Sequence, residues 1–284
     1  MTMFSLHAQL HPKELRIKKA TLFTKKSKYF LERPQPAATG AGWVNFSYNA
    51  PPEQECCVNH INSVLALRTQ QLQKTTKPFN ARGSRVLRCE HCLLPQADCL
   101  CAKKPQPCAR SAFLLLMYTG ECFKPTNTGR LIADVASDNH AFVWDRTQPD
   151  PALLALLADP RYQPIVIFPT QYAEPSRCID QPVTDGKIPL FIMLDGTWRE
   201  AKKMFNKSPY LAAFPVLGIQ PATASCYQLR EAAHLHQLCT AEVAVEILKL
   251  ADDHQAAAAL AEYFQQFRQH YIAGKPHLNF ITAD

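Results

Sequence analysis

Glycine is scarce in this sequence of 284 residues, which contains only nine glycines. Neither a Gly-x-Gly-x-x-Gly fingerprint nor a Walker-type loop occurs, and both depend on glycine because their backbone must approach a phosphate closely. Rossmann-type dinucleotide binding and P-loop nucleotide hydrolysis are therefore disfavoured. No Ser-His-Asp or catalytic Cys-His arrangement stands out either, which argues against the corresponding hydrolases.

The sequence also lacks long apolar runs. No uninterrupted run approaches the roughly 20 residues that a membrane-spanning helix needs, and the first residues lack an apolar secretory region with a small-residue cleavage site. Hydrophobic residues nevertheless make up 47% of the chain, which is enough to bury a substantial core. We expect a soluble, cytoplasmic protein that does not contact membranes, and no obligate protein partner is evident.

Acidic residues are in deficit, with 24 Asp and Glu against 31 Lys and Arg, for a formal charge of +7. This charge is compatible with a polyanionic partner, but eight of the basic residues lie within the first 33 positions. Residues 1–55 combine these basic pieces with proline-containing segments and have no sustained periodicity. We predict that they form a disordered extension, or sequence translated upstream of the true start, and we assign them no function.

The most informative segment covers residues 190–205. Leu190 to Leu194 form an apolar run of the right length for a buried strand, and residues 199–205 contain good helix formers. Between them lie Asp195, Thr197 and Trp198. In an open α/β sheet, ligands bind where the carboxyl end of a strand leads into a helix, so these side chains are candidates for a functional site. The alternative is that Asp195 or Thr197 only caps the helix and Trp198 belongs to the core.

Strands and helices alternate in the rest of the chain. The patterns predict strands at residues 111–117, 141–144, 164–168 and 214–219, and helices at residues 59–76, 130–137, 151–158 and 240–271, with Gly274 as a stop signal. This alternation predicts an α/β fold with a mostly parallel sheet and flanking helices. We place a small amino-terminal module at residues 56–108 and a catalytic α/β domain at residues 109–284.

Four of the eleven cysteines are clustered within 13 residues, at Cys89, Cys92, Cys99 and Cys101. Zinc favours tetrahedral coordination by four thiolates, and four closed ligands leave no open position for catalysis, so we predict a structural Zn²⁺ site. An iron–sulfur cluster and redox pairing are the alternatives. The scattered cysteines are expected to be ordinary reduced thiols, and they are Cys108, Cys122, Cys178, Cys226 and Cys239.

Several segments together resemble the DTW-domain family, and the resemblance runs from about residue 75 to the end. The segment Asp195-Gly196-Thr197-Trp198 is similar to the signature for which the family is named. The cysteine cluster is similar to the family's amino-terminal cysteines. The other matching segments are Lys124 to Arg130 with Glu121, Ser225 to Arg230, and Cys239 to Glu242.

The resemblance implies an activity like that of bacterial tRNA-uridine aminocarboxypropyltransferases. Such an enzyme moves the 3-amino-3-carboxypropyl group of S-adenosylmethionine to N3 of the uridine at position 47 in the variable loop of tRNA, which gives acp3U. The resemblance also implies a SPOUT-like fold with a carboxy-terminal knot, although knots are rare in general. The rival functions are a SPOUT-type RNA methyltransferase and a non-catalytic, zinc-dependent RNA-binding protein.

In this interpretation Asp195 is the candidate base, Thr197 orients it and Trp198 packs beside the uracil base or the cofactor. The residues expected to contact S-adenosylmethionine lie on loops and strand ends, and they are Asn127, Thr128, Gly129, Arg130, Phe168, Pro169, Leu194, Gly196, Tyr227, Arg230 and Thr240. An arginine, Arg130 or Arg230, is suited to hold the methionine carboxylate. The alternatives are turn formation at residues 126–129, a strand stop at Pro169, a surface ion pair at Arg230 and a helix cap at Thr240.

Overall fold

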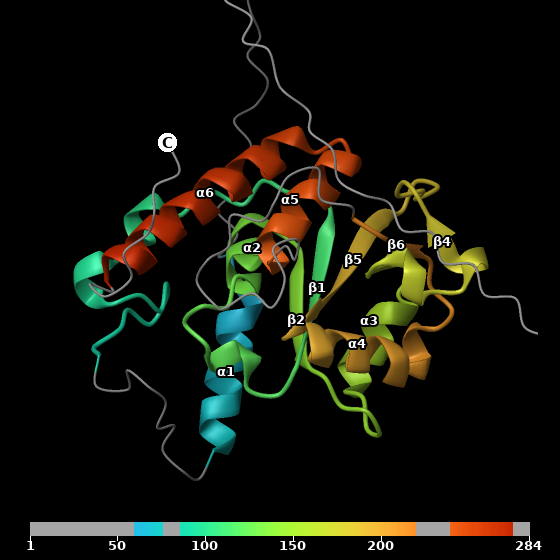
Figure 1. Ribbon diagram of the computed structural model, residues 1–284, viewed down its shortest axis with the longest axis horizontal. Helices are drawn as coiled ribbons and strands as arrows, with labels where there is room; N and C mark the ends of the chain where they lie inside the picture. The colour runs from blue at the N-terminus through green and yellow to red at the C-terminus, as the bar shows by residue number, and fades with distance from the viewer. Residues whose placement is uncertain (1–59, 76–85, 220–238, 275–284) are drawn as a thin grey trace, which may run out of the picture. The chain divides into compact units, whose positions relative to one another are not determined.

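The computed structural model describes residues 60–75, 86–219 and 239–274 of the chain. Its centre is a parallel sheet with the strand order β2-β1-β5-β3-β6-β4 (Figure 1). The strands are β1 (Ala112–Met117), β2 (Asn139–Val143), β3 (Tyr162–Ile167), β4 (Cys178–Ile179), β5 (Ile188–Asp195) and β6 (Val216–Leu217). Every strand pair in this sheet is parallel, which confirms the predicted α/β fold. The knot and the SPOUT-like arrangement stay predictions.

Helices cover both faces of the sheet. The helices are α1 (Ser63–Lys74), α2 (Gly129–Val135), α3 (Pro151–Ala158), α4 (Trp198–Lys207), α5 (Thr240–Leu250) and α6 (His254–Ala273). Figure 1 shows α3 and α4 on the opposite side of the sheet from α1, α2 and α6. Among the described residues, no helix is both long and apolar enough to cross a membrane.

The central strands are apolar on both faces because each face is covered. In β1, Phe113 and Leu115 belong to the core beneath α1, α2, α5 and α6, whereas Leu114 and Leu116 belong to the core beneath α3 and α4. Side chains alternate between the two faces of a strand, so a strand buried on both sides needs a continuous apolar run. This is why the apolar runs at residues 111–117, 164–168 and 190–194 predicted β1, β3 and β5 correctly.

The amino-terminal helix and the cysteine segment share the core of the α2 and α6 layer. Val64 and Leu67 of α1 and Leu94 and Leu100 of the cysteine segment are buried in it. Asn62 caps α1 by accepting hydrogen bonds from two backbone N–H groups, and its amide donates to the carbonyl of Arg130 at 2.8 Å. The helix is therefore fastened to α2 at its first turn.

The carboxy-terminal helical stretch is broken into α5 and α6, which the sequence pattern did not predict. The break occurs at Asp252, whose backbone is left-handed with a φ of 55°. The buried carboxylate of Asp253 accepts a hydrogen bond from the backbone N–H of Arg110 at 2.7 Å. Aspartate tolerates the left-handed region better than most residues, and the contact with Arg110 holds the turn in place.

Candidate active site and metal centre

Asp195 is the last residue of β5 and lies at the carboxyl edge of the sheet. β5 is flanked by β1 and β3, and Asp195 is paired in register with Met117. Its backbone carbonyl accepts a hydrogen bond from the N–H of Tyr118 at 2.8 Å, and its side chain is only 3% exposed. Leu194, just before it, is half-buried. The predicted strand-turn-helix geometry is therefore present, with the carboxylate at the position where α/β sheets bind ligands.

Two segments that are distant in sequence hold the carboxylate of Asp195. The Asn127 amide donates to Oδ2 at 2.7 Å, and the Thr240 hydroxyl donates to Oδ1 at 2.8 Å. Asn127 lies in the loop before α2, and Thr240 is the first residue of α5. The structure thus brings together three residues that the sequence analysis selected separately. Hydrogen bonds to both oxygens fix the orientation of the carboxylate.

A second buried carboxylate lies beside this group. The Asn127 amide also donates to Glu121 Oε1 at 3.3 Å, and Lys124 forms an ion pair with the same glutamate. Glu121 is only 1% exposed. The loop hydroxyl of Thr128 accepts a hydrogen bond from the backbone N–H of Ala241 at 3.2 Å, so the loop is attached to the first turn of α5. The loop therefore donates hydrogen bonds to both buried carboxylates through Asn127 and accepts one from the start of α5 through Thr128.

Gly129 begins α2 in close contact with the site. A Cβ atom at this position would lie 2.6 Å from Asp195 Oδ2 and 3.2 Å from Asn127 Oδ1. Real Cβ atoms do not approach an oxygen to 2.6 Å, so only glycine allows the helix to start this close to the carboxylate. Gly196 is similarly tight, because its Cβ would lie 3.1 Å from Glu200 Cβ and 3.2 Å from Tyr118 Cβ.

We expect Gly129→Ala to lower the free energy of unfolding by about 1–3 kcal/mol through overpacking and to displace the Asp195 carboxylate. The transfer activity that the family resemblance implies should fall by more than the loss of folded protein explains. The reason is that the hydrogen bonds from Asn127 and Thr240 depend on the position of the carboxylate. The control is Gly186→Ala, which strains a left-handed backbone with a φ of 80° but places its Cβ within 4 Å of no other atom. It separates a loss of stability from a displacement of the carboxylate. Thermal melting and product formation would be compared. Full activity in the Gly129 variant would contradict the prediction.

Thr197 is the N-cap residue of α4. Its hydroxyl accepts from the Glu200 backbone N–H, and its own backbone N–H donates to Glu200 Oε2 at 2.7 Å, which forms a capping box. The hydroxyl also donates to Glu200 Oε2 at 2.7 Å. Asn127 and Thr240 supply hydrogen bonds that orient the Asp195 carboxylate, and the orienting role of Thr197 stays a prediction. The helix-cap alternative therefore describes the hydrogen bonds of this hydroxyl.

Trp198 belongs to a cluster of aromatic rings at the sheet edge. Its ring stacks on Phe168 with 5.4 Å between centroids and 5° between planes, while 39% of the residue stays exposed. Phe168 also stacks on Phe205 at 4.4 Å, and Tyr172 meets Trp198 edge-on at 5.7 Å. Pro169 follows Phe168 and precedes the short 3-10 helix Thr170–Tyr172. An indole that stacks on Phe168 and is partly exposed to solvent offers a flat surface on which a uracil base or an adenine can stack.

The side chain of Arg130, another predicted cofactor contact, points away from this group. The guanidinium of Arg130 turns into the core, over the ring of Phe267 at 4.8 Å, and the residue is 0% exposed. Its position gives no support to the predicted role in holding the methionine carboxylate. Tyr227 and Arg230 lie outside the described residues, as do the other positions of the segment from Ser225 to Arg230.

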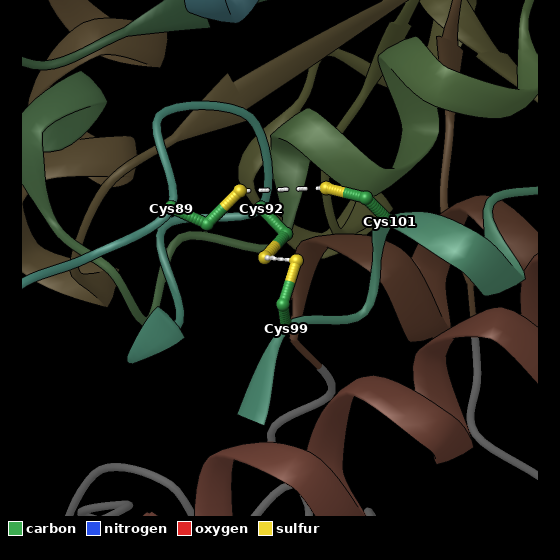
Figure 2. A group of neighbouring side chains, drawn as sticks. All are labelled: Cys89, Cys92, Cys99 and Cys101. Atoms are coloured by element: carbon green, nitrogen blue, oxygen red, sulfur yellow. Dashed lines mark hydrogen bonds between the residues drawn. The ribbon is translucent and has the colours of Figure 1, made fainter. Parts of the chain in front are cut away.

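The four clustered cysteines converge on one point. Their sulfur atoms all lie within 4.8 Å of one another, with 3.5 Å between Cys89 and Cys101 and 3.8 Å between Cys92 and Cys99 (Figure 2). A tetrahedral ion with metal–sulfur bonds of 2.3 Å places its ligands about 3.8 Å apart. The donor set and its spacing therefore fit a single zinc ion, and all four cysteines are free thiols.

The backbone around the cluster favours the thiolate form of Cys89. Burial would raise the pKa of Cys89, but the backbone N–H groups of Cys92 and His91, together with the neighbouring thiols, lower this pKa to about 6. Burial raises the pKa of Cys92 and of Cys101. Leu93 has a left-handed φ of 57°, which forms the tight turn after the first cysteine pair. Four protein ligands would leave no open coordination position on an ion held here.

The fold and these two sites define an α/β protein with a parallel sheet, a buried polar group at the carboxyl edge of its central strand and a separate four-cysteine centre that could hold a metal ion. The family model of the DTW domain matches residues 86–272. This is more than half of the 284 residues, and the chain belongs to the DTW-domain family. The family is associated with tRNA modification. No solved structure matches the chain.

Proposed function

We propose that this protein transfers the 3-amino-3-carboxypropyl group of S-adenosylmethionine to N3 of the uridine at position 47 of tRNA. The observation that carries the proposal is the buried carboxylate of Asp195, held by Asn127 and Thr240 within the motifs of a DTW-domain protein. The SPOUT-like knot, the structural zinc ion and the cytoplasmic location belong to the same proposal and rest on the family resemblance and the cysteine geometry.

Uridine N3 needs help to react because it carries a proton and a neutral imide is a poor nucleophile. Asp195 is the candidate to accept that proton, and its fixed orientation suits a general base. S-adenosylmethionine, when bound, supplies an electrophilic side-chain carbon beside its sulfonium. The N3–carbon bond forms as the carbon–sulfur bond breaks, the bonding electrons pass to sulfur, and the proton passes from N3 to Asp195.

The residues at the sheet edge fit such a reaction. Asn127 and Thr240 hold the carboxylate, and the exposed ring of Trp198 provides a stacking surface close by. Attack on this carbon rather than on the methyl group is a matter of positioning, which can be worth large factors in rate. The predicted contributions of Tyr227 and Arg230 to that positioning remain part of the proposal.

The exposed face of α4 is basic and supports an RNA substrate. Its cationic side chains are Arg199, Lys202, Lys203 and Lys207, whereas its one acidic residue, Glu200, is used in the capping box. The Lys202 ammonium lies 4.4 Å from the centroid of the Tyr172 ring. The Lys203 ammonium donates to the Tyr118 hydroxyl at 3.1 Å. Cations interleaved with aromatic rings suit phosphates and unstacked bases of RNA.

We expect the double variant Lys202→Gln with Lys207→Gln to bind tRNA about tenfold more weakly and to reduce the slope of log K against log salt by about 1.5–2. Each lysine that neutralises a phosphate releases counterions on binding, so its loss changes the salt dependence as well as the affinity. The measurement is fluorescence anisotropy with labelled tRNA at several salt concentrations. The matched control is Lys74→Gln with Lys249→Gln on other helices. Equal slopes for both double variants would refute the predicted interface.

The deciding experiment incubates the purified protein with unmodified tRNA and S-adenosylmethionine, digests the tRNA and determines the masses of its nucleosides. A uridine that is heavier by one aminocarboxypropyl group supports the proposal. A methylated base would support S-adenosylmethionine as the donor but would show that the methyl group, not the aminocarboxypropyl group, is transferred. An unchanged tRNA, from protein that retains zinc, would favour a non-catalytic RNA-binding protein.

A further inference from the structure

Arg130 is a fully buried arginine for which the described structure offers no hydrogen-bond partner. It lies in α2, is 0% exposed, and none of its three guanidinium nitrogens forms a hydrogen bond with the described residues. Its main supporting contact is the face of the Phe267 ring at 4.8 Å. An arginine does not lose its proton in proteins, and its five N–H donors normally find acceptors. A buried cation in this state requires an anion nearby.

The surroundings of the guanidinium narrow the choice of anion. Burial lowers the pKa of Arg130, and nearby groups that carry negative charge when ionised oppose that shift. These groups are Tyr263, Asp134, Cys92 and Cys101. Asp134 is already engaged, because its carboxylate pairs with Lys104 at 2.7 Å and accepts hydrogen bonds from Asn62 and Tyr263.

Burial and the neighbouring Asp134 raise the pKa of Tyr263, so its phenol stays neutral and the cysteines are the remaining source of negative charge. Four thiolates around one divalent zinc ion carry a net charge of −2, since binding of the metal displaces the thiol protons. Cys92 is buried in the same core as Phe267 and Leu131 of α2, so the cysteine centre and the arginine share one apolar environment.

We propose that Arg130 is the buried counter-cation of the metal–tetrathiolate centre and balances part of its negative charge across the shared apolar core. The inference rests on the zinc centre of the proposed function and is independent of the transferase activity. Arg130 acts as a positioning residue, because it follows Gly129, which contacts Asp195, and its backbone N–H donates to Asn127 Oδ1 at 3.3 Å. The metal centre therefore holds the first turn of α2, and that turn holds the group around Asp195.

The test compares Arg130→Met with the matched control Arg177→Met. Arg177 also places its guanidinium over a phenylalanine ring, Phe205 at 5.7 Å, and donates to two backbone carbonyls, but Phe205 packs on the other face of the sheet. Zinc affinity is measured by competition with a chromogenic chelator, and thermal melting is recorded for zinc-loaded and zinc-free full-length protein.

We expect Arg130→Met to weaken zinc binding at least tenfold, because the anionic centre loses its cation. The same variant should melt at a higher temperature than wild type when both are zinc-free, because a buried, unneutralised charge is gone. Arg130→Lys should bind zinc within fivefold of wild type. Arg177→Met should lower both melting temperatures and leave zinc affinity within threefold.

Three results would overturn the inference. The first is a zinc affinity of Arg130→Met within threefold of wild type. The second is an equal loss of melting temperature in the loaded and zinc-free forms of that variant. The third is a wild-type protein that binds no zinc. None of these measurements uses tRNA. The conclusion about Arg130 therefore does not depend on whether the proposed transfer reaction occurs.

Discussion

Asp195→Asn should lower the rate of nucleoside product formation by on the order of 10³-fold, with the affinity for S-adenosylmethionine within severalfold of wild type. The substitution removes the charge and keeps the shape. The amide oxygen of the new residue can accept from Asn127, and its NH₂ group can donate to the Thr240 hydroxyl, which can also act as an acceptor. Both of these hydrogen bonds can therefore be kept, and a loss of rate reports the loss of the base.

Two further variants separate the roles around this carboxylate. Thr240→Val removes one hydrogen bond and keeps the charge, so we expect a rate loss of about tenfold, in line with one net hydrogen bond. Glu121→Gln removes the neighbouring buried charge that Asn127 connects to Asp195. Single-turnover rates of product formation, measured by nucleoside mass, would be compared. If Asp195→Asn retained turnover while Glu121→Gln abolished it, Glu121 would be the base.

Removal of the metal should have the largest effect on stability. Zinc at a thousandfold excess over its Kd stabilises the folded state by about 4 kcal/mol, which corresponds to roughly 10 °C in Tm for a domain of this size. We expect Cys99→Ser to lose the ion and to melt about 10 °C lower than wild type. Cys99 is the exposed member of the cluster, so its replacement changes little packing and mainly removes a ligand.

The control for this variant is Cys108→Ser, which alters a half-buried free thiol outside the cluster. Metal content per chain would be measured by elemental mass spectrometry alongside the melting curves. A chelator should lower the Tm of wild type to that of the Cys99 variant and should leave that variant unchanged. One zinc ion retained by Cys99→Ser, with an unchanged Tm, would sink the prediction of a four-cysteine structural site.

The central part of the sheet was predictable because burial on both faces leaves a continuous apolar run in the sequence. β1, β3 and β5 carry this pattern, and the structure confirms all three. The edge strand β4 has only two residues and therefore no periodicity to detect. The break between α5 and α6 depends on one left-handed aspartate, Asp252, and helix propensities summed over the surrounding residues do not reveal it.

The members of the candidate site were predictable, but their mutual contacts were not. Asn127, Asp195 and Thr240 each lie in a segment that resembles a family motif, yet only the folded chain places both donors on one carboxylate. The orientation of Arg130 could not be predicted either. All seven residues of α2 are buried, so the helix has no polar face that would indicate which side chains turn toward the site.

The sequence analysis selected Phe168 and Trp198, but it gave no sign that their rings stack or that Tyr172 joins them. Phe168, Tyr172 and Trp198 come from two segments that meet only because β3 and β5 are parallel neighbours. A search for aromatic residues within the few positions beyond the carboxyl end of β3 would also have selected Tyr172.

The hydrogen bond from Thr240 to Asp195 has a consequence for the order in which the protein matures. During synthesis the chain emerges from the ribosome amino end first, so all strands of the sheet are available before the first turn of α5. At that stage the Asp195 carboxylate lacks the hydrogen bond from Thr240, and the Thr128 hydroxyl lacks the hydrogen bond from the Ala241 backbone N–H. A nascent chain that lacks α5 can thus pair its strands before the Asp195 carboxylate has received the hydrogen bond from Thr240. The orientation of this carboxylate is completed late in synthesis, when the first turn of α5 forms.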